Sequence, residues 1–225
     1  MTGIVLQARI DSSRLPGKSL LPVNGRPFVF RVMEALNNVS ADLRILTCPE
    51  DSYSSFEHLA QEAGFHIFAG PKEDVLKRFC KVIRYFSLSR IIRATADNLF
   101  VFTDAADSIN SLAVSVNADY AAYTGLPLGA GVESVSSESL LCAAENANAF
   151  EREHVCPYLY NNPDKFAVHR PQAPHYWQNP DFRLTVDTQE DFDQAVKLYE
   201  TLKDEKDRHN GNTIINKYQK IIHGV

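Results

Sequence analysis

The sequence lacks the features that mark secreted, membrane-spanning and disulfide-stabilised proteins. No apolar run approaches the roughly 18 residues that a transmembrane helix needs, and the N-terminus shows no signal-peptide pattern. Its four cysteines, Cys48, Cys80, Cys142 and Cys156, are scattered and form no Cys-x-x-Cys pair. This usage favours free thiols in a reducing compartment over disulfides. We therefore expect a cytoplasmic protein that does not bind membranes.

Three widespread catalytic motifs are also absent. There is no G-x-S-x-G elbow, no G-x-x-x-x-G-K-[ST] loop and no G-x-G-x-x-G turn, which argues against a serine hydrolase, a P-loop NTPase and a dinucleotide oxidoreductase. A zinc site is not expected either, because His154, His169, His175 and Cys156 lack tight ligand spacing.

Composition and charge are those of an ordinary globular protein. The chain has 225 residues, 44% of them hydrophobic and 23% charged, which is enough for one large domain with a sizeable core. Its net charge is −5, so an extended nucleic-acid surface is not expected and any anion site must be a local cluster of cations.

The most informative stretch is the loop that follows a short apolar run at residues 3–6. That run is compact and β-branched, which is typical of a buried strand. The loop carries three cations, two hydroxyls and a Pro-Gly breaker: Arg9, Arg14, Lys18, Ser12, Ser13, Pro16 and Gly17. Such a loop can curl over a polyanion, with backbone N–H groups and cations converging on it. A solvated basic loop would carry the same residues equally well.

Strand and helix patterns alternate through the first half of the chain. Further strands are predicted at 43–46, 65–68 and 90–94, and helices at 28–37, 53–63 and 72–86. This alternation predicts an α/β fold: a three-layer, mostly parallel, Rossmann-like sheet with helices on both faces. The opening loop, residues 47–48 and residues 95–97 all follow strands, so they are expected at one edge, where such sheets bind ligands.

The second half is less regular. A glycine-rich turn at 125–131 leads to a predicted strand at 132–135, interpreted as part of a small β flap. A strand at 182–186 is followed by a helix at 189–202, with Thr188 as N-cap and Asp191 as capping-box acid. The remaining predictions are helices at 104–116, 139–147, 152–161 and 212–222, strands at 118–123 and 166–169, and a loop at 171–180.

Two aspartates, Asp97 and Asp187, each follow a predicted buried strand. A hard divalent cation bound to substrate phosphates takes only one or two carboxylates, so this pair facing a cationic loop is suited to a Mg²⁺–nucleotide site. Each aspartate also suits an ordinary structural role. Asp97 is a common residue type in turns, and Asp187 matches the charge that the N-terminal end of a helix dipole favours.

Residues 7–18, followed by Gly25-Arg26-Pro27, resemble the opening of the spore-coat polysaccharide cytidylyltransferase-like family. That family is related to the CMP-sugar synthetases for sialic acid and 3-deoxy-manno-octulosonate, and its motif Q-A-R-x-x-S-x-R-L-P-G-K carries the triphosphate of the nucleotide donor. The matching positions are Gln7, Ala8, Arg9, Ser12, Arg14, Leu15, Pro16, Gly17 and Lys18. The expected nucleotide-binding loop consists of Ser13 and all of these matching positions except Leu15 and Pro16.

Three further stretches resemble family motifs on the nucleotide and metal side. Residues 93–98 resemble R-x-T-x-D-x-P and residues 184–192 resemble L-T-V-D-T-x-E-D-F, which implies that Asp97 and Asp187 hold the metal, with Thr95 and Ala96 beside the nucleotide. The family usually has proline where this chain has Leu99. Residues 73–79 match E-D-V-L-x-R-F, which lies beside the nucleotide.

That third match implies nucleotide contacts for Asp74 and Arg78. The alternative for Arg78 is a helix-surface salt bridge to Asp74 at i,i+4. Thr47 and Cys48, at the second strand end, are expected to line the base or ribose pocket.

The acceptor side is implied by two weaker matches. Glu133 occupies the family's G-x-x-x-E position, and residues 152–158 resemble R-E-H-V-T-P-Y with Cys156 in place of threonine. These matches make Glu133, Arg152 and His154, together with Asn98, candidate acceptor-binding residues. His154 is a candidate catalytic base or a structural histidine.

The resemblance predicts a Mg²⁺-dependent nucleotidyltransferase that transfers CMP from CTP, or NMP from another NTP, to a small anionic acceptor such as a sugar acid or sugar phosphate, for surface polysaccharide precursors. Lys18 and Arg14, supported by Arg9, would neutralise charge on the triphosphate and the pyrophosphate leaving group. Within one domain, residues 1–124 would bind the nucleotide. Residues 125–180 would bind the acceptor and form a possible homodimer contact, and residues 181–225 would return to the sheet.

Two alternatives remain from other classes. A GT-A-type glycosyltransferase would use a finished nucleotide-sugar, but the loop at 95–98 is Thr-Ala-Asp-Asn rather than Asp-x-Asp. A catalytically silent nucleotide-binding subunit is the other. Release of pyrophosphate from CTP and acceptor would distinguish a nucleotidyltransferase from the glycosyltransferase. Binding of CTP without turnover would favour the silent subunit.

Overall fold

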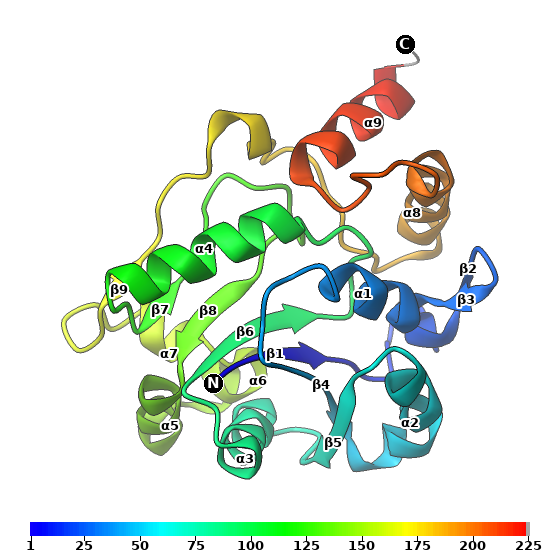
Figure 1. Cartoon of the computed structure of the whole chain (residues 1–225). Helices are drawn as coiled ribbons and strands as arrows, with labels where there is room; N and C mark the ends of the chain where they lie inside the picture. The colour runs from blue at the N-terminus through cyan, green and yellow to red at the C-terminus, as the bar shows by residue number, and fades with distance from the viewer. Residues whose placement is uncertain (224–225) are drawn as a thin grey trace.

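A mixed sheet of seven strands forms the centre of the protein, whose computed structural model describes residues 1–223 (Figure 1). From one edge to the other, the strands are β5 (His66–Gly70), β4 (Leu43–Pro49), β1 (Thr2–Gln7), β6 (Arg90–Thr95), β8 (Glu133–Ser136), β7 (Tyr120–Ala121) and β9 (Val168–His169). The first four are parallel to one another, which confirms the predicted α/β sheet.

The carboxyl ends of β1 and β6 are level with each other, and β4 continues past them to Pro49. Gln7, the last residue of β1, lies opposite Thr47 on one side and Thr95 on the other. From β1 the chain continues to β4 on one side and later to β6 on the other, so the strand order reverses here. A crevice forms at such a switch point because the connections leave the strand ends in opposite directions.

Side chains of β1 alternate between two hydrophobic cores. Ile4 and Leu6 belong to the core on one face and Val5 to the core on the other, as the two-residue period of a strand requires. The first core is closed by α1 (Phe28–Leu36), α2 (Tyr53–Glu62), α4 (Thr103–Ser115), α8 (Gln189–Leu202) and α9 (Gly211–His223). The second is closed by α3 (Val75–Phe86), α5 (Ser137–Asn146) and α7 (Pro157–Tyr160), and α6 (Ala149–His154) packs against α3. The result is the predicted three-layer arrangement (Figure 1).

Two helix starts show how local sequence shapes the edge of the crevice. Helix α3 begins at Val75 rather than at residue 72, because the Asp74 side chain accepts from the Lys77 backbone N–H at 2.9 Å and caps the helix. Residues 71–74 are therefore loop. The predicted capping box of α8 is confirmed, since Thr188 and Asp191 exchange side-chain and backbone hydrogen bonds.

Five predictions for the second half need correction. Residues 182–186 form no regular strand, because their backbone pairs with loops: Leu184 N–H donates to Leu128 at 3.0 Å and Val186 N–H donates to Asp97 at 2.7 Å. The strand expected in a flap is β8, which lies in the main sheet between β6 and β7. The helix expected at 152–161 is broken into α6 and α7 at Val155, whose φ is 74°. The strands at 118–123 and 166–169 shrink to two residues each.

A small hairpin after the opening loop, β2 (Pro22–Val23) and β3 (Arg26–Pro27), escaped prediction, although Asn24-Gly25 between them is a strong turn signal. Short 3₁₀ turns occur at Lys18–Leu20 (η1), Glu50–Ser52 (η2) and His175–Trp177 (η3). Across residues 1–223, no helix combines the length and the apolar character that crossing a bilayer demands.

His209 fixes the loop between α8 and α9 to the start of α4. Its carbonyl accepts from both the backbone N–H and the hydroxyl of Thr103, each at 3.1 Å, while its Nε2 accepts from Arg208 at 3.0 Å. Burial, followed by the charge of Arg208, lowers the pKa of His209 from 6.5 to about 4.

We predict that His209 makes the fold acid-sensitive. The unfolded chain binds the proton more readily, so stability is complete above pH 6.5 and falls between pH 6.5 and about 4, by up to about 3 kcal/mol. Replacing the ring in His209→Gln should flatten the dependence of the unfolding free energy on pH in that window, as measured by denaturant titration. The exposed His58→Gln is the matched control and should keep the wild-type slope. A wild-type slope in His209→Gln would contradict this assignment.

Candidate functional site

A cavity of about 480 Å³ opens at the carboxyl ends of β1 and β6. Its walls come from the loop after β1, the β5–α3 loop, the end of β6, the end of α6 and the segment before α8. This is the edge predicted from the strand pattern. Of the predicted nucleotide-binding residues, those that line it are Gln7, Ala8, Arg9, Ser12, Ser13, Arg14, Lys18, Arg78, Thr95, Ala96 and Asp97.

The loop after β1 is closed by its own backbone. Gly17 takes a left-handed conformation, with φ of 69°, and its N–H donates to Ile10 at 3.3 Å. The Ser19 hydroxyl donates to the Arg9 carbonyl at 2.7 Å. Gly17 therefore shapes the loop from outside the cavity, as its conformational freedom allows.

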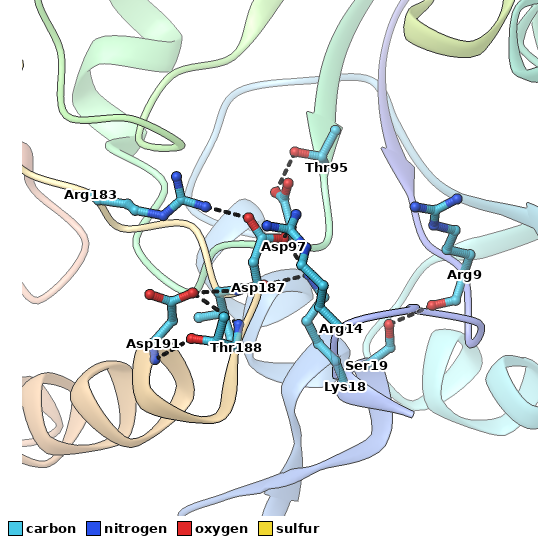
Figure 2. A network of polar contacts seen from close by, with 11 residues as sticks. Arg9, Arg14, Lys18, Ser19, Thr95, Asp97, Arg183, Asp187, Thr188 and Asp191 are labelled. Carbon is cyan, nitrogen blue, oxygen red and sulfur yellow. Dashed lines mark hydrogen bonds and ion pairs between the residues drawn. The ribbon is translucent and has the colours of Figure 1, made fainter. Parts of the chain in front are cut away.

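Asp187 joins this loop to the segment before α8. Its carboxylate lies 3.0 Å from Arg14 Nη2 and 3.7 Å from Lys18 Nζ, and it accepts a hydrogen bond from Arg183 (Figure 2). Lys18 Nζ also donates to the Val186 carbonyl. With three cations around it, the Asp187 side chain is held at the cavity wall.

Asp97 lies beside Asp187 because the two segments are hydrogen-bonded through their backbones. The Val186 N–H donates to the Asp97 carbonyl at 2.7 Å, and the Thr95 hydroxyl donates to Asp97 Oδ1 at 2.6 Å. Both carboxylates line the cavity, and Figure 2 shows them at the same place, next to the Arg14 side chain.

This donor set fits a phosphate-bound Mg²⁺. Within residues 1–223 there is no cluster of three or more His, Cys, Asp or Glu side chains that would hold a metal without substrate. Magnesium in nucleotide enzymes binds through one or two carboxylates and completes its shell with phosphate oxygens and water. Asp97 and Asp187, which both line the cavity, would be the two carboxylates for such an ion.

Arg78 is a buried cation without an acidic partner in the described chain. The residue is 1% exposed, its Nη1 donates to the Pro71 carbonyl at 2.7 Å, and no atom of residues 1–223 accepts from its Nε. Burial is the main cause of the lowered pKa of Arg78; Cys48 opposes the shift and the nearby Arg9 adds to it. The predicted alternative, a salt bridge from Arg78 to Asp74, is wrong.

A buried guanidinium beside a second arginine is unfavourable unless an anion enters. Arg9 likewise makes no salt bridge within the described part of the chain, and both side chains line the cavity. The cavity is therefore suited to a polyanionic ligand.

Besides Gly17, three predicted nucleotide contacts lie outside the cavity wall. Thr47 and Cys48 are fully buried behind it, where the Thr47 hydroxyl donates to the Phe68 carbonyl at 3.1 Å. Burial raises the pKa of the Cys48 thiol to about 11, so it stays protonated at neutral pH. Their neighbour Pro49 reaches the cavity instead. Asp74 caps α3 and pairs with Arg152 at 2.9 Å.

Of the predicted acceptor residues, only His154 reaches the cavity, where its ring lies 4.4 Å from that of Phe150. The other three do not line the cavity, because each side chain has partners elsewhere. Arg152 pairs with Asp74 and donates to the Ala144 and Ala147 carbonyls, Asn98 is buried against the Gly129 carbonyl and Phe100 N–H, and Glu133 pairs with Arg93 and Tyr120. Leu99, at the usual proline position, is buried in the core.

Lys72 and Arg93 are lining residues that sequence reasoning missed. Lys72 pairs with Asp11 at 2.6 Å and with Asp51 at 3.1 Å, which connects the β5–α3 loop to the opening loop. The signal for Arg93 was a charged residue near the end of an otherwise apolar strand; Lys72 gave none beyond its place after the Gly70-Pro71 breaker.

Comparisons with known proteins identify similar sequences and structures. The family model for cytidylyltransferases matches residues 3–222. The spore coat polysaccharide biosynthesis protein SpsF of Bacillus subtilis is 34% identical over 205 residues, which span 87% of this chain and 85% of that protein.

Two solved structures share the fold. A cytidylyltransferase from Leptospira borgpetersenii aligns with a TM-score of 0.90 at 22% identity, over 99% of this chain and 95% of its own. A CMP-2-keto-3-deoxy-manno-octonic acid synthetase solved in complex with CTP aligns with a TM-score of 0.70 at 14% identity, over 89% of this chain and 98% of its own.

We predict that the buried charge of Arg78 lowers the stability of the fold and strengthens anion binding. Arg78→Met should leave the unfolding free energy within about 1 kcal/mol of wild type, or raise it, because an unpaired buried charge is removed. The same change should reduce by more than half the rise in Tm caused by inorganic tripolyphosphate with Mg²⁺, as measured by thermal shift. Arg84→Met, on the exposed face of α3, should leave that rise unchanged. A full ligand-induced rise in Arg78→Met would contradict the role.

Proposed function

Since the chain belongs to the cytidylyltransferase family and is therefore a nucleotidyltransferase, we propose that it transfers CMP from CTP to a small anionic acceptor in a Mg²⁺-dependent reaction. An acceptor oxygen attacks the α-phosphorus, the bond to the β-phosphate oxygen breaks, pyrophosphate leaves and the acceptor loses its proton. Catalysis of this kind depends mainly on positioning and charge neutralisation.

One observation carries the proposal: a cationic loop and two carboxylates meet at one wall of the cavity. Arg14 and Lys18 lie against Asp187, and Asp97 is hydrogen-bonded to the same segment. A triphosphate needs cations along its length, and a metal bound to it needs carboxylates on its far side. Both kinds of group are present in one cavity lined by Arg9 and Arg78 as well.

The cations have distinct proposed roles. Lys18 is 8% exposed and held by the Val186 carbonyl, so it is a preorganised charge for the phosphate chain. The Arg14 side chain is 62% exposed and can change partner from Asp187 to the leaving pyrophosphate. Arg9 supports the same charge from the start of the loop.

Asp97 and Asp187 are the proposed Mg²⁺ ligands. The bound ion would neutralise charge on the α-phosphate and orient the attacking oxygen. Two residues of the chain position these carboxylates: Thr95 donates to one oxygen of Asp97, and Arg183 donates to one oxygen of Asp187.

For the acceptor we propose a sugar acid or sugar phosphate that enters a surface polysaccharide. The support is the named role of the Bacillus subtilis relative and the 3-deoxy-manno-octonic acid specificity of the structural neighbour. His154, at the cavity wall, is the proposed acceptor contact. Homodimerisation through residues 125–180 is supported by the exposed apolar side chains of Leu128, Phe150 and Tyr176.

A nucleotide screen tests the donor. In thermal shift with Mg²⁺, CTP should raise Tm more than UTP, ATP or GTP do, and Asp187→Asn should lose most of the Mg²⁺-dependent part of that rise. Asp193→Asn, on the exposed side of α8, is the matched control. Equal shifts for all four nucleotides would remove the assignment to CTP. Pyrophosphate-release assays over nonulosonic acids and sugar phosphates then identify the acceptor.

With that acceptor, Lys18→Ala should slow pyrophosphate release about 10²- to 10³-fold, because a preorganised charge at the transferring phosphates is lost. Circular dichroism should show an intact fold. The exposed Lys81→Ala should retain wild-type turnover. Near-wild-type turnover of Lys18→Ala would overturn the assignment of the loop.

A further inference from the structure

A chain of polar side chains crosses the sheet beside the cavity, with one residue from each of four neighbouring strands. Tyr120 on β7 donates its hydroxyl to Glu133 Oε1 at 2.9 Å. Arg93 on β6 donates from Nη1 to Glu133 Oε2 on β8, its direct partner in the strand register. Arg93 Nη2 donates to Gln7 Oε1 at the end of β1, at 3.3 Å.

The charges of these four side chains cancel. The Arg93 and Glu133 side chains are only 14% and 20% exposed. Burial disfavours the charged guanidinium, but the Glu133 carboxylate outweighs burial and holds the pKa of Arg93 above its ordinary value. The same burial, with Glu133 adding to it, raises the pKa of Tyr120, so its hydroxyl keeps its proton and remains a donor. Together, the four side chains therefore add hydrogen-bond donors to the cavity without adding net charge.

The direction of these hydrogen bonds fixes the orientation of the Gln7 amide. A guanidinium has donors only, so the Gln7 atom that faces Arg93 must be the oxygen. The Gln7 NH₂ group is then directed elsewhere, and both Gln7 and Arg93 line the cavity. Arg93 Nε is also without an acceptor in residues 1–223. With its oxygen held by Arg93, the Gln7 amide has its NH₂ group left for a ligand, whereas the unpaired Arg93 Nε is buried.

We propose that the Gln7 NH₂ group binds an uncharged oxygen of the nucleoside part of the donor, a base carbonyl or a ribose hydroxyl. Arg93, Glu133 and Tyr120 are positioning residues that hold the amide in the binding orientation. The inference rests on the proposed function, since it assigns a part of CTP to a part of the cavity.

Charge distribution favours the nucleoside over the phosphates at Gln7. The phosphates are drawn to the net positive positions, Arg9, Arg14 and Lys18, which begin two residues further along the chain. An uncharged amide discriminates by hydrogen bonding instead, because a ligand without an acceptor there leaves the Gln7 N–H groups unpaired. Glu133 therefore acts from behind the wall, which accounts for its absence from the cavity.

Titration calorimetry with two probes tests the assignment: CTP with Mg²⁺, and inorganic tripolyphosphate with Mg²⁺. Gln7→Met should weaken CTP binding about tenfold, the loss of one hydrogen bond, and change tripolyphosphate binding less than twofold. Glu133→Gln should weaken CTP binding about threefold to fivefold, because Arg93 and the amide lose their fixed orientation. The double variant should bind CTP no more weakly than Gln7→Met, since Glu133 acts only through Gln7.

The controls separate this inference from a general loss of structure. Gln61→Met, exposed on α2, should bind both probes as wild type does, and Gln7→Asn replaces Gln7→Met if the latter does not fold. Unchanged CTP affinity in Gln7→Met, or equal losses for both probes, would overturn the nucleoside contact. Additive effects of Gln7→Met and Glu133→Gln would overturn the positioning role. If the wild-type protein itself does not bind CTP, the proposed function fails instead.

Discussion

The contact between Asp187 and the loop after β1 is the interaction on which the site depends. The two segments are far apart in the sequence, and the carboxylate brings them together by pairing with Arg14 and Lys18. Lys18 strengthens the link by donating to the neighbouring Val186 carbonyl, and the Val186 N–H reaches Asp97. A buried lysine, two acidic residues and the end of β6 are thereby fixed relative to one another. Preorganisation of this kind is the main contribution a protein makes to phosphoryl chemistry.

The rest of the cavity has a positively charged part and an uncharged part. Arg9, Arg14 and Lys18 present positive charge along the loop, and the buried Arg78 has no carboxylate partner in the described chain. Gln7 presents an uncharged amide, and Glu133 cancels the charge of the neighbouring Arg93. A nucleoside triphosphate has the same division between a polyanionic chain and an uncharged nucleoside. In the proposed function, the fit between the two patterns orients the α-phosphate toward Asp97, Asp187 and the acceptor.

Most of the opening-loop residues that line the cavity could be predicted from the sequence, whereas the partners of Glu133, Asn98 and Arg152 could not. The loop at 7–18 is a contiguous motif, the strand ends follow from periodicity, and Thr188 with Asp191 is a local capping signal, so each depends on neighbours in sequence. Glu133, Asn98 and Arg152 instead find partners on segments that only the tertiary structure brings near, namely Arg93, the Gly129 loop and Asp74. Residues 182–186 alternate as a strand would, but they pair with loops. Local pattern identified the residue types and left their partners open.

The most direct test of the central claim is a crystal structure of the protein with CTP and Mn²⁺, in which anomalous scattering locates the metal. We expect a metal bound by both Asp97 and Asp187 and by a phosphate oxygen, with Lys18 on the phosphate chain and Arg14 moved from Asp187 to the triphosphate. A metal bound away from these two carboxylates, or a triphosphate that does not contact the loop after β1, would contradict the claim.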